Sequence, residues 1–231
     1  MTRVVLVRHG ESVCNAQRVV GGHEGCTGLT VTGRNQANAL RNRLKVTGEL
    51  AGATALYSSE LERAFETASI ISPEVGGGRL EVLRRCSVCE LHPGEGDGLD
   101  WQELNERYGQ PDWDNRPDTP LAPGGETWRE FVIRSSGALV ELAESHPGGT
   151  VVIACHGGVI DSSMATFLEL PARGRPAGFF PAYTSITEWE MESGNWRLVR
   201  YNDVAHLGGP FEAEKDGPHT IRARAEEPQQ A

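Results

Sequence analysis

The chain has 231 residues, of which 38% are hydrophobic and 23% are charged, and its formal net charge is −10. This size and balance are typical of one globular α/β domain with a sizeable core, and no apolar stretch is long enough to cross a bilayer. The acidic balance and the lack of a basic face argue against a nucleic-acid-binding protein. We therefore expect no nucleic acid and no membrane as a partner, and an anionic ligand would need a local pocket of arginine and histidine.

The N-terminus leads directly into an apolar run, without the basic and apolar regions of a secretory signal. The five cysteines are an odd number, and a chain of this size does not depend on disulfide bonds for its stability. We therefore expect reduced, mostly buried thiols and a cytoplasmic protein. Cys86 and Cys89 form a CxxC pair, which invites a redox or zinc interpretation. With no second CxxC and no histidine pair at ligand spacing, we predict a structural role for this pair, no metal and no other cofactor.

The hydrophobic pattern predicts strands that alternate with amphipathic helices. Strands are expected at residues 4–7, 53–57, 80–83 and 150–155, with a closing hairpin at 184–191 and 195–201. Helices are expected after Gly33 and at residues 60–71, 100–108, 127–146 and 159–168, with Ser58 and Ser59 available to cap the second of these. The alternation predicts a three-layer α/β/α sandwich around a mostly parallel sheet.

One domain is expected over residues 1–207, with an irregular insertion at about 91–125 that forms a cap over the site. Residues 208–231 are polar and rich in charge, so we expect them to form a disordered tail.

Two of the predicted strands are followed by His-Gly. The first run ends in Arg8-His9-Gly10, and the strand at 150–155 precedes His156-Gly157. Because the carboxyl ends of parallel strands lie at one edge of a sheet, His9 and His156 are expected to converge there. Arg8 and Arg63 can join them, and two guanidinium groups with two imidazoles suit a phosphoryl group. Such a pocket needs no metal.

The order of these motifs resembles that of the histidine phosphatase superfamily, in the branch that holds cofactor-dependent phosphoglycerate mutases and related phosphatases. The matching segments are Arg8-His9-Gly10-Glu11-Ser12 with Asn15, Leu29-Thr30-x-x-Gly33, Ser58-Ser59-x-x-x-Arg63-Ala64, Glu90, Pro123-Gly124-Gly125-Glu126, His156-Gly157-Gly158 and Asn202-x-x-x-His206. The resemblance covers about residues 3–207 in the family's order.

The resemblance implies a role for each matched residue. His9 would be the nucleophile that forms a phosphohistidine, while Arg8, Arg63 and His156 would hold the phosphoryl oxygens. Glu90 would be the general acid and would then activate water, although its surroundings depart from the family's usual sequence. The substrate-binding roles fall to Ser12, Asn15, Thr27, Gly28 and Gly157, and capping or turn roles would explain Ser12 and Thr27 as well.

These features predict a histidine acid-type phosphatase, that is, a metal-independent phosphomonoesterase for a small phosphorylated metabolite. The segment from Glu90 to Pro123 is shorter than the insertion of the family's mutases, which favours hydrolysis. A cofactor-dependent phosphoglycerate mutase and a catalytically silent phosphate-binding regulatory protein are the alternatives. We expect residues 91–122 and 173–183 to determine which substrate binds, and the second segment includes Phe179 and Phe180. The sequence leaves the oligomeric state open, with a homodimer as one alternative.

Overall fold

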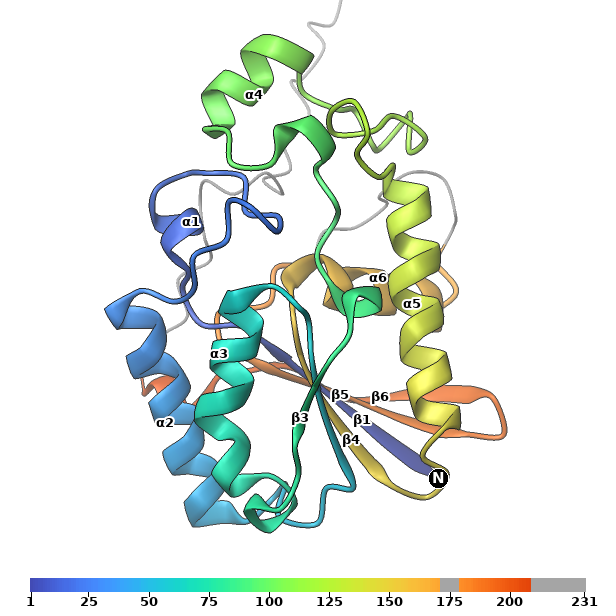
Figure 1. Ribbon diagram of the computed structural model, residues 1–231. Coiled ribbons are helices and arrows are strands. Elements are labelled where there is room, and N and C mark those ends of the chain that lie inside the picture. Colours follow the sequence, from blue (N-terminus) through green and yellow to red (C-terminus); the bar gives the residue numbers. More distant parts are fainter. Residues whose placement is uncertain (171–178, 209–231) are drawn as a thin grey trace, which may run out of the picture.

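A six-stranded sheet forms the centre of the protein, seen here in a computed structural model that describes residues 1–170 and 179–208 (Figure 1). The strands are β1 (Thr2–Arg8), β2 (Ala55–Ser58), β3 (Val82–Arg84), β4 (Thr150–Cys155), β5 (Ile186–Glu192) and β6 (Asn195–Asp203), in the spatial order β3-β2-β4-β1-β5-β6. The pairs among β3, β2, β4 and β1 are parallel, whereas β5 and β6 join as antiparallel strands. The predicted mostly parallel sheet is confirmed.

The helices are α1 (Val13–Ala16), α2 (Val31–Thr47), α3 (Glu62–Ile71), α4 (Trp101–Tyr108), α5 (Trp128–Glu144) and α6 (Gly157–Phe167), with short 3-10 turns between them. Polar side chains cap the N-termini of several of these helices. Thr30 caps α2, Asp100 caps α4, and Thr127 forms a capping box with Glu130 at the start of α5. The predicted serine cap of α3 is wrong, because α3 begins after Leu61 and has no side-chain cap.

Alternate residues of β1 face opposite sides of the sheet, as the two-residue period of a strand requires. Val4 and Leu6 belong to a core cluster that includes residues of α5 and α6. Val5 and Val7 belong to a second cluster with residues of α2 and α3. Helices therefore cover both faces of the sheet, and the predicted three-layer sandwich is confirmed (Figure 1).

The predicted cap segment includes α4, which lies at the same end of the molecule as α1 (Figure 1). Backbone hydrogen bonds join the cap to the loop after α1, because Val20 N donates to Leu99 O at 2.8 Å and Gly98 N donates to Val20 O at 2.9 Å. The predicted tail, apart from Gly208, lies outside the described residues. None of the helices in the described part of the chain combines the length and apolar character needed to cross a membrane.

Two glycines let the loop after β1 pass against the start of α2. A Cβ atom on Gly33 would lie 2.0 Å from Glu11 O, and one on Gly10 would lie 2.5 Å from Gly33 O. Side chains of α2 hold the same loop, since Glu11 N donates to the Gln36 Oε1 at 2.9 Å. This close approach sets the path of the chain directly after His9.

We predict that Gly33→Ala destabilises the protein by about 1–3 kcal/mol, because the added methyl group collides with backbone atoms. The matched control is Gly137→Ala in α5, where a Cβ atom would meet nothing within 4 Å. There the better helix propensity of alanine should raise the free energy of unfolding by about 0.5–1 kcal/mol. Urea denaturation measures both values, and a stabilising Gly33→Ala would contradict the close approach.

Candidate active site

The carboxyl ends of β1 and β4 bring His9 and His156 together. The register pairs Arg8 with Cys155, so the next residue of each strand is a histidine at the same level. His9 N donates to Cys155 O at 3.0 Å, and the two ring centroids are 5.1 Å apart. Both imidazoles are buried. The predicted convergence of the two histidines therefore occurs at one edge of the sheet.

Arg63 lies between the two imidazoles, although its side chain is a buried cation with a relative exposure of 4%. It belongs to the first turn of α3. Its Nε donates to His9 Nε2 and to His156 Nδ1, at 3.2 Å in each case, and its Nη1 donates to Gly21 O at 2.7 Å. The guanidinium thus fixes both rings relative to the loop that contains Gly21.

These hydrogen bonds decide which ring nitrogens carry protons. Since Arg63 Nε–H donates to His9 Nε2, that nitrogen keeps its lone pair, and His9 Nδ1–H donates to Gly10 O at 2.7 Å. By the same argument His156 accepts at Nδ1 and carries its proton on Nε2. The buried His156 Nε2 has no hydrogen-bond partner among the described residues, so it is available to donate to a ligand.

Burial keeps both imidazoles neutral. Loss of hydration lowers the pKa of His9 well below its usual 6.5, and the nearby charges of Arg63 and Arg8 lower it further. The pKa of His156 is lowered by burial in the same way, with Arg63 as the next cause. The unprotonated Nε2 of His9 is therefore a nucleophilic nitrogen at neutral pH.

Two buried cysteines, Cys14 and Cys26, lie beside Arg63. The hydrogen bond from Cys14 lowers the pKa of Cys26 to about 5, and the Arg63 cation lowers it as well. Cys26 Sγ also accepts the backbone N–H of Arg63 at 3.5 Å, and Cys14 Sγ lies 3.8 Å from Arg63 Nη1. A negative charge on Cys26, which the lowered pKa favours, would offset part of the cost of burying the guanidinium.

Glu90 sits over the start of α6. Its Oε2 accepts the backbone N–H of Gly158 at 3.0 Å, and its Oε1 accepts that of Leu91 at 3.2 Å. These two backbone donors hold the carboxyl group of Glu90 in a fixed orientation at the start of α6. A Cβ atom on Gly158 would lie 2.2 Å from Glu90 Oε1, which explains the glycine at this position.

Arg8 approaches the site from β1, and Tyr183 completes its surroundings. Arg8 Nη1 donates to Pro181 O at 2.6 Å, and its Cζ lies 4.2 Å from the centroid of the Tyr183 ring. The same ring lies 5.8 Å from that of His9. The sequence analysis gave Tyr183 no role beside His9; its position before the strand that pairs antiparallel with β1 becomes clear only from the fold.

The matched residues near the C-terminus hold the Tyr183 segment in place. Thr184 N donates to Arg8 O at 3.0 Å, and Thr184 Oγ1 bonds His206 Nε2 at 2.9 Å. Asn202 Oδ1 accepts Ala182 N at 2.7 Å. Residues 173–178 of the predicted specificity segment lie outside the described residues, and Phe179 packs beside the ring of Tyr201 at a centroid distance of 5.9 Å.

The predicted substrate-binding residues occupy varied positions. Ser12 is buried and caps α1, where its Oγ accepts Asn15 N at 3.3 Å and donates to Asn15 Oδ1. Asn15 and Thr27 are exposed, and Gly28 has a φ of 100° and accepts Val13 N at its carbonyl. Gly157 begins α6, and a Cβ atom on it would lie 3.6 Å from Arg8 Nε. Their binding roles stay predictions.

Two histidines also lie beside the CxxC pair, where the sequence analysis found none at ligand spacing. His23 Nε2 lies 3.6 Å from Cys86 Sγ, although 63 positions separate the two residues in the chain, and His92 Nε2 lies 3.4 Å from the same sulfur. The expectation about the histidines was wrong because His23 reaches the pair from the loop after α1.

We predict that His9 and His156 stay neutral well below pH 6.5 in the ligand-free protein. ¹⁵N NMR of labelled histidine should show their unprotonated forms where exposed histidines have already titrated. Because the unfolded chain binds these protons near pH 6.5 and the folded chain does not, the free energy of unfolding should fall as the pH drops below about 6.5. Protonation of either ring near pH 6.5 or above would contradict the assignment.

Comparisons with known proteins agree with this geometry. The family model of the histidine phosphatase superfamily (branch 1) matches residues 4–204. The chain is 35% identical to phosphoglycerate mutase-like protein 4 of Arabidopsis thaliana, over 88% of this chain and 86% of that protein. It is 30% identical to the metal-independent phosphoserine phosphatase of the same plant, over 90% of this chain and 84% of that protein.

A solved structure has the same fold. The mycobacterial glucosyl-3-phosphoglycerate phosphatase in complex with VO3 matches with a TM-score of 0.71 and 30% sequence identity, over 87% of this chain and 98% of that one. Together with the ordered motifs and the convergent histidines, these matches establish that the chain belongs to the histidine phosphatase superfamily, in its branch 1.

Proposed function

We propose that the protein is a metal-independent phosphomonoesterase that hydrolyses a small phosphorylated metabolite through a phosphohistidine on His9. The observation that carries the proposal is the neutral His9 Nε2, held by Arg63 in a buried position beside His156. Two of the relatives named above are phosphatases, one of phosphoserine and one of glucosyl-3-phosphoglycerate.

In the first step, the lone pair of His9 Nε2 attacks phosphorus in line with the ester oxygen. The bond from phosphorus to that oxygen breaks, and Glu90 gives its proton to the departing alkoxide. A phosphoryl oxygen takes over the Nε–H of Arg63, while His156 Nε2–H and Arg8 bind the others. The positive charge that the transition state requires thus comes from two guanidinium groups.

In the second step, water attacks the phosphohistidine and Glu90, now a carboxylate, takes one of its protons. The nitrogen–phosphorus bond breaks, inorganic phosphate leaves, and His9 Nε2 regains its lone pair. The hydrogen bond from His9 Nδ1–H to Gly10 O keeps the ring oriented and stabilises its positive charge while it carries the phosphoryl group. Both steps use side chains that converge on the same edge of the sheet.

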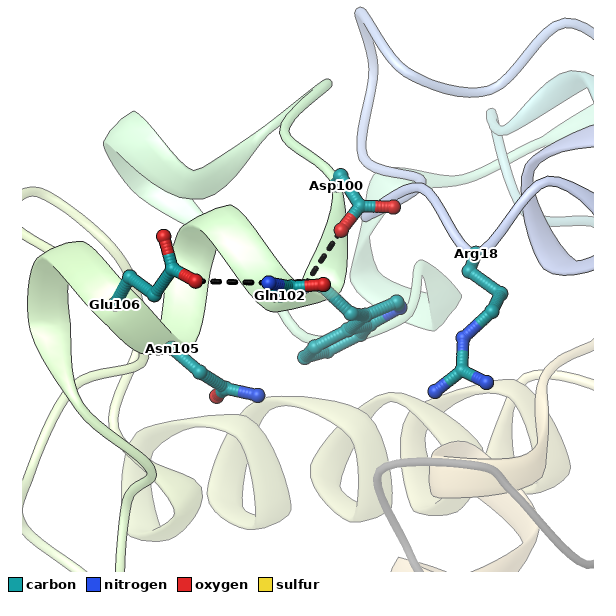
Figure 2. Close-up of a pocket in the computed structure, with 6 residues that line it drawn as sticks. Arg18, Asp100, Gln102, Asn105 and Glu106 are labelled. Carbon is teal, nitrogen blue, oxygen red and sulfur yellow. Dashed lines mark hydrogen bonds between the residues drawn. The ribbon is translucent and has the colours of Figure 1, made fainter.

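A cavity of about 650 Å³ at the cap suits the rest of a small metabolite (Figure 2). Five of its six lining residues have polar side chains, and the lining consists of Arg18, Asp100, Trp101, Gln102, Asn105 and Glu106. Three of these side chains already bond at α4, since Gln102 Nε2 donates to Glu106 Oε1 and Asp100 caps the helix. The side chain of Arg18 makes no hydrogen bond or ion pair with the described residues, although its backbone does. An ester with a second anionic group, such as a carboxylate, therefore fits this cavity.

Arg18 is connected to the phosphoryl pocket through the backbone. Its carbonyl accepts Trp101 N at 3.0 Å, and three residues further along the chain Gly21 O accepts Arg63 Nη1. One short segment thus lines the cavity at one end and holds the buried guanidinium at the other. This arrangement supports one substrate that spans both places.

We predict that His9→Ala loses at least 10³-fold in the rate of p-nitrophenyl phosphate hydrolysis. Glu90→Gln should form the phosphoenzyme from this activated ester, which needs little help from an acid, but should hydrolyse it about 10²–10⁴-fold more slowly. A burst of p-nitrophenolate and an acid-labile phosphoenzyme would report this difference, and the exposed Glu95→Gln is the matched control. Full activity of His9→Ala, or activity of the unaltered protein that requires an added metal ion, would refute the proposal.

We predict that Arg18→Ala raises KM roughly tenfold or more for phosphate esters that carry a carboxylate, because a charge-assisted hydrogen bond is lost. The KM for p-nitrophenyl phosphate should change little. Arg107→Ala, on the exposed face of α4, is the matched control. Equal effects of Arg18→Ala on both kinds of ester would rule out this recognition. Efficient conversion of 3-phosphoglycerate that depends on 2,3-bisphosphoglycerate would instead favour a mutase.

A further inference from the structure

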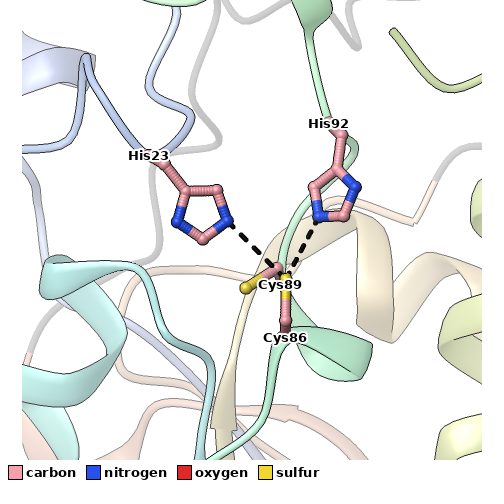
Figure 3. Close-up of side chains that lie close together, drawn as sticks. All are labelled: His23, Cys86, Cys89 and His92. Carbon is pink, nitrogen blue, oxygen red and sulfur yellow. Dashed lines mark hydrogen bonds between the residues drawn. The ribbon is translucent and has the colours of Figure 1, made fainter.

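His23, Cys86, Cys89 and His92 form a compact cluster beside the phosphoryl pocket (Figure 3). One ligand atom from each residue lies within 4.8 Å of each of the others. Figure 3 shows the imidazoles of His23 and His92 directed toward the sulfur of Cys86, with Cys89 close by. We propose that this cluster binds one Zn²⁺ ion as a structural site, separate from the residues that carry the phosphoryl chemistry.

The distances already approach those of a tetrahedral site. Zinc bonds of about 2.3 Å to sulfur and 2.0–2.1 Å to nitrogen place neighbouring sulfur and nitrogen ligands about 3.5 Å apart at a tetrahedral angle. The Cys86 Sγ lies 3.6 Å from His23 Nε2 and 3.4 Å from His92 Nε2. Small rotations of the four side chains would therefore bring all of them to the bond lengths of zinc.

Neighbouring groups orient the ligands as they do around known metal sites. Glu126 Oε2 lies 3.6 Å from His92 Nδ1, which leaves His92 Nε2 directed at the sulfur. Ser59 Oγ donates to Cys89 Sγ at 3.2 Å. Arg134 Nη1 lies 3.1 Å from the carbonyl oxygens of Cys86, Ser87 and Cys89, and this fixes the turn that carries both thiols.

The charges of the cluster also match a divalent ion. Two thiolates would balance the charge of Zn²⁺, and Arg134 is already neutralised by Glu126, with both nitrogen–oxygen distances at 2.6 Å. Two sulfur and two imidazole ligands favour zinc over magnesium or calcium, which prefer oxygen. His23 is exposed and Cys89 is buried, so an ion can enter from the surface and bind at depth.

Four protein ligands would fill a tetrahedral shell and leave no position for substrate or water, so the site is structural. It would join two segments that meet the phosphoryl pocket. Cys89 directly precedes Glu90, and His23 follows the Gly21 whose carbonyl accepts Arg63. Zinc would therefore clamp the segment of the candidate acid to the loop that holds the buried guanidinium.

The test is metal analysis of the full-length protein, purified under reducing conditions without chelators. We expect one zinc ion per chain, and X-ray absorption should show two sulfur neighbours at about 2.3 Å and two nitrogen neighbours at about 2.0 Å. Cobalt(II) in its place should give the visible absorption of a tetrahedral ion with thiolate ligands. Removal of the ion should lower Tm by roughly 5–15 °C, because the metal binds the folded chain in preference to the unfolded one.

Three variants separate this cluster from the other thiols. Cys86→Ser and the milder surface change His23→Gln should each lower zinc affinity at least tenfold. The double variant Cys14→Ser/Cys26→Ser removes the other cysteine pair and should keep the cobalt spectrum. A reduced protein that takes up no zinc or cobalt, a spectrum that survives in Cys86→Ser, or a spectrum lost only with Cys14 and Cys26 would overturn the proposal. Phosphohistidine formation measures the proposed function independently of these readouts.

Discussion

The contact of Arg63 with both His9 and His156 is the interaction on which the rest of the site depends. A buried guanidinium donates one N–H to two imidazole nitrogens, and this is compatible only with rings that carry a lone pair at those atoms. Burial then lowers both pKa values and keeps the rings neutral. The cation, the tautomers and the nucleophilic nitrogen are thus consequences of one arrangement.

Several local structures position this cation and compensate for the hydration that it loses on burial. The register between β1 and β4 places both histidines at one level, and α3 delivers Arg63 to them from its first turn. Gly21 O accepts its Nη1–H, and Cys26 Sγ accepts the backbone N–H of the same residue. Because these groups come from separate segments, disturbance of the loop after α1 is expected to reach the guanidinium and both imidazoles.

Sequence reasoning succeeded where local pattern determines position. His9 and His156 follow buried runs of aliphatic residues, and parallel strands place such ends side by side. It failed where contacts depend on tertiary packing. Tyr183 reaches His9 because β5 runs antiparallel to β1, and His23 reaches the cysteines across a distant loop. Ser59 has the composition of a helix cap, yet its hydroxyl accepts Leu61 N and donates to Cys89 Sγ, one residue before the candidate acid.

In the proposed reaction, the neutral Nε2 of His9 is the atom that takes up the phosphoryl group. The most direct measurement is NMR of ¹⁵N-labelled phosphoenzyme, trapped after reaction with an activated phosphate ester, in which phosphorus couples to the ring nitrogen that holds it. The account predicts coupling to Nε2 of His9, with Nδ1 still protonated and bonded to Gly10 O. Phosphorus on Nδ1, on His156 or on any other residue would contradict it.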